Sequence, residues 1–333
     1  MKNLFLFFFI LQAIVGFGQS EEALSIKKRD IDTTYIQDIS DDLIIKLNTD
    51  NNIVSYKYLN NDSGRQFEIK SSQIYKTFFS VDYKFLGMAI SIPQEILPFS
   101  DEDNKEGKSK SLSLGLSFFL NRWLQNLNYS YTKGFYLTDA TNANTSLPNL
   151  SKTKYSGTTS YVINNKKFSY YAHYYQTNIQ KISAGSFIPT LNYYYLYSND
   201  VDKNTNISYN ENLLYANLAI CYQYNWVPMD KILISAGISS GIGINYSEKM
   251  NSSQSDKTKF YSNNFTFNTN FTLSYRFEKL FVGAQFYTNS IKSKENEITS
   301  LSNNINYGVF FVGYRFKAPK IIERPFNWIE NKF

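Results

Sequence analysis

Residues 263–277, NNFTFNTNFTLSYRF, alternate between apolar and polar side chains from Phe265 to Phe277, with Thr269 as the one polar residue in the apolar row. Successive side chains of an extended strand point to opposite faces, so a period of two predicts one apolar row and one polar row. A strand of a soluble protein usually has about 5–6 residues, whereas a tilted strand needs about 9–11 residues to cross a bilayer. We therefore expect a membrane-spanning strand with Phe267 and Phe271 facing lipid and Asn268 and Asn270 facing a wet interior.

The same alternation recurs in KSLSLGLSFFLN (110–121) and in KILISAGISSGIGINY (231–246). In the second segment, isoleucines such as Ile238 oppose a row of Gly and Ser that includes Ser239 and Gly241. A row of such small side chains fills little volume in a packed core. It predicts either a narrow, wet lumen or a position beneath a large neighbouring side chain.

Composition agrees with strands rather than with membrane helices. Aromatic residues make up 17% of the chain and the mean hydropathy is -0.37. An apolar run long enough for a membrane helix does not follow the N-terminal segment, which excludes a helical membrane protein. The start, MKNLFLFFFILQAIVGFGQS, predicts a secretory signal peptide over residues 1–19. Cys221 is the only cysteine, so no disulfide forms within the chain.

The connections between alternating segments differ in length. Short ones lie at 85–87, 120–123, 164–167, 227–231 and 276–280, and long polar ones lie at 100–110, 138–155, 199–210, 247–258 and 290–304. Short turns on one side and long loops on the other are typical of a transmembrane β-barrel, with the short turns in the periplasm. A barrel must close, because an open edge leaves backbone groups unpaired in hydrocarbon. A soluble β-sandwich is the alternative, but it needs a dry core and few such long strands with a fully polar face.

We expect an all-β, antiparallel up-and-down barrel of about 12 strands in the cell outer membrane, with 14 if residues 41–72 contribute. Segments 156–164, 167–178 and 186–199 are among the predicted strands. This assignment contains a conflict, because a periplasmic turn at 164–167 makes the short link 178–186 extracellular. Either a strand lies within 138–155, or 178–186 is not a simple turn. The expected organisation is a signal peptide (1–19), an irregular periplasmic lead-in (20–40), the barrel (41–316) and a periplasmic tail (317–333).

The segment YVINNKKFSYYAHYYQTNIQKISAGSF (161–187) resembles a family of exported bacterial proteins known as domain of unknown function 4421. The most specific part is the QKISAGS stretch, Gln180 to Ser186. The segments VDYKFLGMAISI (81–92), KGFYL (133–137) and GYRF (313–316) are also similar to that family. The resemblance implies an outer-membrane barrel of unknown activity and supplies no catalytic residues.

Few residues indicate chemistry. His173 is the only histidine, and on a strand it shares a face with Ser169, Tyr171 and Tyr175. Outer-membrane lipid hydrolases place a His two residues before a nucleophilic Ser, and here that position holds Tyr175, so we expect no enzyme of that kind. We expect no metal site and no cofactor. The candidate lumen residues, which form either a structural ion-pair network or a selectivity device, are Lys76, Asp82, Lys84, His173, Arg276 and Arg315.

These features leave the function open. A narrow pore or binding barrel for a small solute is our first hypothesis, and a structural or docking barrel with a plugged lumen is the alternative. A lipid-modifying enzyme is the least favoured. The expected partners are outer-membrane lipids, the barrel-assembly machinery during insertion and a periplasmic partner of the tail. The net charge of +6 is dispersed along the chain, and no nucleic-acid partner is expected.

Overall fold

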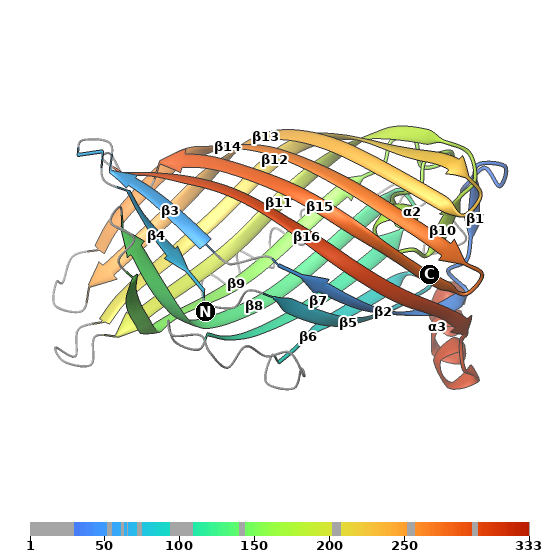
Figure 1. Cartoon of the computed structure of the whole chain (residues 1–333), viewed down its shortest axis with the longest axis horizontal. Helices are drawn as coiled ribbons and strands as arrows, with labels where there is room; N and C mark the ends of the chain where they lie inside the picture. Colours follow the sequence, from blue (N-terminus) through green and yellow to red (C-terminus); the bar gives the residue numbers. More distant parts are fainter. Residues whose placement is uncertain are drawn as a thin grey trace.

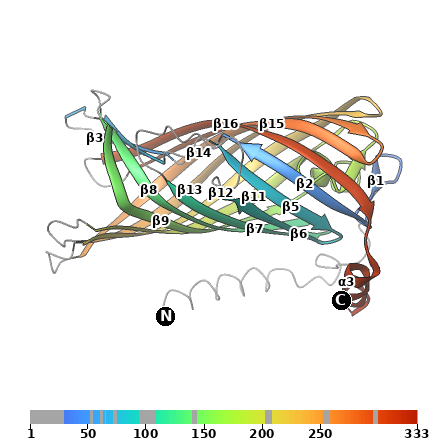
Figure 2. The same ribbon diagram turned by 60° about the horizontal axis from the view of Figure 1, so that its bottom comes forward.

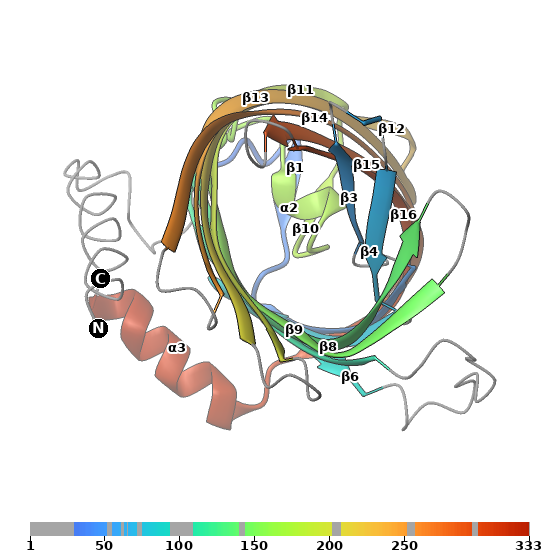
Figure 3. The same ribbon diagram turned by 90° about the vertical axis from the view of Figure 1, so that its left-hand side faces the viewer.

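Twelve antiparallel strands form a closed barrel in the computed structural model (Figures 1, 2 and 3). The structure describes residues 30–51, 55–60, 63–64, 66–71, 75–93, 109–139, 144–201, 208–251, 257–294 and 299–332. Each barrel strand pairs with the next along the chain, and β16 pairs with β2 to close the ring. The barrel strands are β2 (Asp42–Asp50), β5 (Lys76–Tyr83), β6 (Leu86–Ile92), β7 (Lys110–Leu120), β8 (Trp123–Asp139), β9 (Asn144–Tyr161), β11 (Ala184–Val201), β12 (Ser208–Met229), β13 (Ile232–Asn251), β14 (Lys257–Phe277), β15 (Leu280–Lys294) and β16 (Thr299–Lys317).

The fold class and the count of twelve strands are confirmed, but one predicted member is wrong. Residues 167–178 are not a barrel strand, because this segment lies inside the barrel. β2 takes the place of that strand in the ring and comes from the 41–72 region. The same region also contains a hairpin, β3 (Ser55–Asn60) and β4 (Gln66–Lys70), which is part of the large sheet without belonging to the ring of twelve.

The β3–β4 hairpin extends the wall where four neighbouring strands are short. β2, β5, β6 and β7 have 9, 8, 7 and 11 residues, whereas β12 has 22. β3 pairs with the beginning of β16 and β4 pairs with the end of β8. The hairpin therefore joins the two long strands that flank the short ones, at the barrel end where the long strands project (Figure 1).

Most of the predicted long loops are strand instead. β8 and β9 are described to Asp139 and from Asn144, so the predicted loop 138–155 is largely paired backbone. Strands also extend into the predicted loops 199–210, 247–258 and 290–304 from both sides. The predicted loop 100–110 lies mainly outside the described residues. These strand ends are mainly polar and lack the alternation, so the sequence pattern did not predict them as strands. Their backbones are nevertheless paired.

Four two-residue turns connect strands at the opposite end, which we call the turn end. They lie at 84–85, 121–122, 230–231 and 278–279. Lys84, Asn121 and Glu278 have φ values of 52°, 50° and 36°. Positive φ at the first position is what tight hairpins require, because such turns match the twist of the paired strands. No helix within the described ranges is both long and apolar enough to span a bilayer.

The two rows of β14 lie as the alternation predicts. Phe267 and Phe271 are exposed on the outer wall, while Thr266 and Thr272 are buried inside. The Gly and Ser row of β13 lies beneath side chains of the neighbouring strands, as in the second of the two interpretations, although these side chains are medium-sized or small rather than large. A Cβ at Gly237 would overlap the amide of Gln223, and Gly241 lies close to Asn217, Ala219 and Thr266. The glycines of this row leave room for the amide side chains of the neighbouring strands.

We expect Gly237→Ala to destabilise the barrel by about 1–3 kcal/mol, because the new methyl group displaces Gln223. Gln223 Nε2 donates to Ser235 Oγ at 2.7 Å and to Asn270 Oδ1 at 2.8 Å, and both bonds depend on its position. Gly308→Ala is the matched control, since its Cβ would meet Phe286 at an ordinary 3.5 Å. Urea unfolding in detergent micelles measures both, and equal midpoints would contradict the packing described.

Candidate functional site

A plug fills the turn end of the barrel. The connection between β9 and β11, residues 162–183, folds back inside the ring and contains α2 (Tyr170–His173) and β10 (Asn178–Gln180). β10 pairs with β1 (Ile36–Asp38), so residues 30–41 and 162–183 together form what we call the plug (Figure 3). The predicted lead-in is therefore not irregular throughout, because residues 36–38 form a strand. This answers the topological conflict, since 178–186 is no simple turn.

Two local features bend the chain around α2. Ser169 caps α2, and its Oγ accepts a hydrogen bond from Ala172 N at 3.2 Å. Gln176 has a φ of 63°, which turns the chain after the helix toward β10. The alternating letters of FSYYAHYYQT suit a strand, but these local bonds and the surrounding barrel give the segment another conformation.

Apolar side chains anchor the plug to two sides of the wall. Tyr171 and Tyr175 pack against Phe119 and Leu124 of the wall, and Tyr175 contacts Phe119 with ring centroids 4.5 Å apart. A second cluster joins Phe168 of the plug to the wall. These contacts remove large aromatic side chains from water, which stabilises the plug by burial of apolar area. The second cluster contains Val162, Phe168, Ala184 and Ile188.

Polar bonds hold the plug from around the ring. Because α2 and its flanks lack a neighbouring strand, their carbonyl groups need other donors. Side chains of β2, β12, β15 and β16 supply them, and Tyr175 Oη donates to Asn126 Oδ1 of β8 at 2.5 Å. Ser117 of β7 lies 3.1 Å from the same Oη. The bonds to carbonyl oxygens are Lys46 Nζ to Tyr175 (3.1 Å), Asn225 Nδ2 to Ser169 (2.8 Å), Gln285 Nε2 to His173 (3.1 Å) and Arg315 to Gln176 (3.4 Å).

Gln180 is the most connected side chain of the plug. Its Nε2 donates to the carbonyl oxygens of Lys167 and Ile182 at 2.6 and 2.8 Å. Its Oε1 accepts from Ser169 N at 2.9 Å and from Asn225 Nδ2 at 3.2 Å. One buried amide thus satisfies backbone groups on both sides of the plug, and Asn225 links it to β12.

The rest of the QKISAGS stretch holds the exit of the plug. Ser183 Oγ accepts from Val227 N at 2.9 Å, and Ser186 Oγ accepts from Asn164 N at 3.0 Å. Asn164 Nδ2 donates to the Gly185 carbonyl at 2.9 Å. The residues that carry the family resemblance therefore bond the two ends of the plug to each other and to the wall.

A buried ion pair lies beside the plug. Lys46 Nζ of β2 and the Asp82 carboxylate of β5 are 2.8 Å apart, with side-chain exposures of 7% and 3%. Lys46 also donates to the plug through the Tyr175 carbonyl. A buried charge without a partner is costly, so each member of this pair depends on the other.

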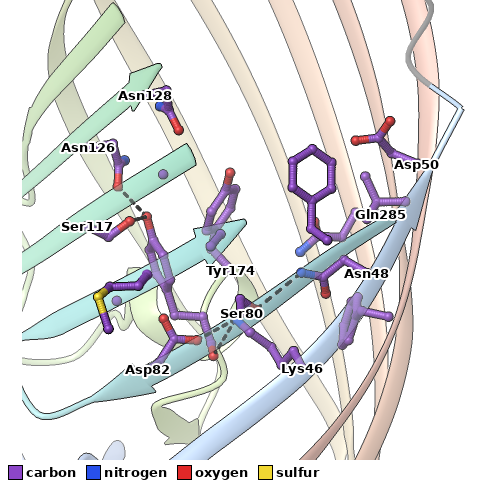
Figure 4. Close-up of a pocket in the computed structure, with 18 of the residues that line it drawn as sticks. Lys46, Asn48, Asp50, Ser80, Asp82, Ser117, Asn126, Asn128, Tyr174 and Gln285 are labelled. Atoms are coloured by element: carbon purple, nitrogen blue, oxygen red, sulfur yellow. Dashed lines mark hydrogen bonds and ion pairs between the residues drawn. The ribbon is translucent and has the colours of Figure 1, made fainter. Parts of the chain in front are cut away.

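Between the plug and the wall lies a cavity of about 360 Å³, which we call the lumen cavity (Figure 4). The rings of Tyr174 and Tyr175 form its plug side, and the Tyr174 side chain is 41% exposed. The wall contributes amides, hydroxyls and the Lys46–Asp82 pair. The other polar lining residues include Asn48, Asp50, Ser80, Ser117, Asn126, Asn128, Gln285, Tyr287 and Tyr307, and the apolar ones include Phe78, Met88, Val309 and Phe311.

The six candidate lumen residues occupy three places. Asp82 lines the lumen cavity, and Lys76 lies on the same face of β5, opposite Asp50 in register. His173 lies in the plug. Arg315 contacts the plug, and its guanidinium lies 4.7 Å from the centre of the Phe281 ring. Lys84 and Arg276 lie at the turn end, where Arg276 donates to the Asp230 carbonyl and Lys84 pairs with Glu330.

His173 is enclosed by aromatic rings. Its ring lies 4.7 Å from that of Tyr170, and Nδ1 has no hydrogen-bond partner within the described part of the chain. Burial lowers the pKa of His173 to about 3, so the side chain is neutral at physiological pH. Ser169 Oγ already serves as the helix cap. This geometry gives the imidazole a packing role in the plug.

Lys46, Tyr174 and Gln180 were not among the predicted site residues. Lys46 lies in LIIKLN, a short segment whose alternation is too brief to assign faces. Tyr174 and Gln180 lie in the segment that resembles a strand. The excess of Tyr in this segment was the available signal. It does not distinguish the two structures, because a lipid-facing strand and a lumen plug both use aromatic residues.

The comparisons with known proteins give a family but no activity. A family model described as "Domain of unknown function (DUF4421)" matches residues 30–316. The chain belongs to this family. No curated protein matches the chain.

Solved structures resemble the DUF4421 chain only distantly. An outer membrane channel from Pseudomonas putida F1 is 11% identical, with a TM-score of 0.38, over 83% of this chain and 95% of that one. The outer membrane protease OmpT from Escherichia coli is 8% identical, with a TM-score of 0.35, over 88% and 100%. OprG from Pseudomonas aeruginosa is 10% identical, with a TM-score of 0.31, over 83% and 96%. Similarity at this level carries no argument about the function of this chain.

We expect Asp82→Ala to destabilise the protein by about 3–5 kcal/mol, because it leaves Lys46 charged and buried without its partner. The double variant Lys46→Met with Asp82→Leu should recover most of this loss, since it removes both charges and keeps the volume. Urea unfolding of the three proteins in detergent tests this. A single variant as stable as the original would show that the pair is not buried.

Proposed function

We propose that this protein is an outer-membrane β-barrel that binds a small, uncharged, polyhydroxy solute in its lumen cavity, above the plug. The closed ring supports the membrane location, because closure leaves no strand edge in hydrocarbon. The outer wall supports it as well, since large apolar side chains are exposed around the ring. They include Leu47, Ile90, Leu114, Leu218, Ile242, Phe267, Phe286 and Phe310.

In this proposal, the turn end faces the periplasm and the long strands project outward. Short turns on the periplasmic side are the rule for such barrels. The barrel-assembly machinery inserts the chain, and residues 1–19, which lie outside the described residues, direct its export. Outer-membrane lipids surround the wall.

The lumen cavity carries the solute proposal. Its volume of about 360 Å³ lies within the roughly 300–1,000 Å³ range of small-molecule sites. Its lining carries three charged residues, of which Lys46 and Asp82 form an ion pair. The third, Asp50, lies opposite Lys76 in register, and Lys76 is not part of the lining. Once Lys76 is counted, the charges of these four residues balance, which favours an uncharged solute, because an ion would leave its own charge without a counterpart.

The polar groups of the cavity favour hydroxyl-rich compounds. Asn48, Asn126 and Asn128 each offer a donor and an acceptor, which match the two roles of a sugar hydroxyl. Tyr174 presents a partly exposed ring on which the apolar face of a sugar can pack. We therefore favour a mono- or disaccharide as the solute class.

The plug favours binding over free passage. Its backbone and side chains are bonded to β2, β7, β8, β12, β15 and β16. Passage through the turn end requires these bonds to break together. The protein at rest is therefore a closed binding barrel, and transport of the solute would require the plug to move.

Phe271→Arg should destabilise the protein by about 2–4 kcal/mol in a bilayer, the cost of a lipid-facing Arg near the membrane centre. Asn268→Arg, on the inward face of the same strand, should cost less, because that face is polar and Asn268 itself is only partly buried. Reversible unfolding from lipid vesicles gives both values. The opposite ranking would mean that the outer wall is not in contact with lipid.

Tyr174→Ala should weaken solute binding about tenfold, because an aromatic contact contributes up to about 1.5 kcal/mol. Saturation-transfer NMR of the detergent-solubilised protein, with a mixture of mono- and disaccharides and zwitterionic amino acids, identifies the bound class. Titration calorimetry with the compound detected then gives the affinities. Tyr224→Ala, which removes an exposed ring from the outer wall, is the matched control and should bind normally.

Two outcomes would contradict the proposal. Binding of amino acids but no saccharide would show that the solute class is wrong. Steady channels of the unmodified protein in planar bilayers would show that the plug does not close the barrel, and would favour the open-pore hypothesis.

A further inference from the structure

The C-terminal helix α3 (Lys320–Lys332) lies beside the barrel rather than beneath its opening. In Figure 1 it stands at the turn end, after β16, and runs across the barrel axis. In Figure 3, which looks along the barrel, it is seen lengthwise outside the ring of strands. A helix in this position runs parallel to the plane of a membrane that surrounds the barrel.

Two contacts fix the orientation of α3. The Phe326 ring packs against Tyr83 and Phe85 at the turn end, with centroid distances of 5.0 and 5.1 Å. Glu330, one turn later, pairs with Lys84. Burial alone would lower the pKa of Lys84, but the hydrogen bond and the charge of Glu330, with Asp41, raise it above its usual value. This anchor therefore stays charged at neutral pH.

The anchored helix leaves large apolar side chains uncovered. Ile321 is 82% exposed and Trp328 is 62% exposed. They are seven positions apart, which is about two helical turns and places both on one face. The Lys332 ammonium lies 4.9 Å from the centre of the Trp328 ring. A Trp with a neighbouring cation is typical of the boundary between hydrocarbon and headgroups.

We propose that α3 is an interfacial helix that binds the phospholipid headgroup layer of the inner leaflet. The proposal rests on the outer-membrane location proposed above. The apolar outer wall continues to the same level, because Trp226, Phe277 and Tyr314 are exposed near the turn end. Ile321 and Trp328 extend this apolar surface sideways into the acyl boundary, while Lys320 and Arg324 supply positive charge for lipid phosphates.

The charge of α3 supports lipid as the partner that covers its exposed face. Three basic residues, Lys320, Arg324 and Lys332, stand against Glu323 and Glu330, and Glu330 is already paired with Lys84. The side of α3 that is not held by the barrel is therefore net positive. A membrane with anionic phospholipid complements both this charge and the exposed apolar face.

Single-tryptophan proteins test the placement of α3. Trp123→Phe with Trp226→Phe leaves Trp328 as the reporter, and Trp123→Phe with Trp328→Phe leaves Trp226 on the barrel wall. Both full-length proteins are reconstituted into vesicles of phosphatidylcholine and phosphatidylglycerol whose acyl chains carry bromine near the headgroup. We expect quenching of Trp328 to reach at least about half that of Trp226. Adding Lys320→Glu and Arg324→Glu should reduce the Trp328 quenching more with phosphatidylglycerol present than with phosphatidylcholine alone.

The pair of reporters separates this inference from the proposed location. Quenching of Trp226 without quenching of Trp328 would overturn the interfacial helix and leave the membrane barrel intact. No quenching of either would show that the barrel is not in the bilayer. If Trp328 is not quenched by bromine but is shielded from aqueous acrylamide, a protein covers the face instead, which also overturns the inference.

Discussion

The antiparallel pairing of β2 with β16 joins the two ends of the sheet, and the rest of the molecule depends on it. Val309 to Lys317 of β16 pair with Asp50 to Asp42 of β2. This pairing closes the ring of twelve strands, and closure is the condition for placing the wall in hydrocarbon. It also encloses the inward rows of all twelve strands around one space. The plug, the lumen cavity and the rim that holds α3 exist only because this space is closed.

Enclosure determines the polar chemistry of the interior. Inward amides and hydroxyls lose contact with bulk water and must bond to each other or to the plug. Gln223, Asn225 and Gln180 do this with side-chain amides that each bond to more than one partner. The plug is in this sense a part of the wall, because its carbonyl groups accept the donors that the inward rows present.

The lumen cavity and the helix α3, which carry the two proposals, are both connected to β2. β2 supplies Lys46 to the plug and the lumen cavity, and the residue before β2, Asp41, lies 3.4 Å from the Lys84 that holds α3. The proposed solute site and the proposed membrane helix are therefore both connected to the same part of the ring. The short strands of this sector differ from the long strands on the other side, where the inward rows bond mainly to each other.

Local alternation was sufficient for the fold class and for the two faces of long strands. Phe271 and Asn270 were assigned to the correct sides because side-chain direction follows from a period of two. Four of the five predicted short connections, at 85–87, 120–123, 227–231 and 276–280, overlap the tight turns of the turn end, whereas 164–167 lies in the plug. The Gly and Ser row was readable only as two alternatives, since the sequence of one strand does not show which neighbours reach across it.

Tertiary structure alone decided the plug. The segment around His173 alternates like its neighbours, and a period of two does not distinguish a strand in the wall from a segment bonded to six strands far apart in the chain. Lys46 acquires its importance in the same way, because Asp82 and Tyr175 reach it only when the ring has closed. The sequence by itself determined which residues face outward and which face inward, since that depends on each strand separately. Only the closed barrel decided what fills the interior, since that depends on contacts between strands.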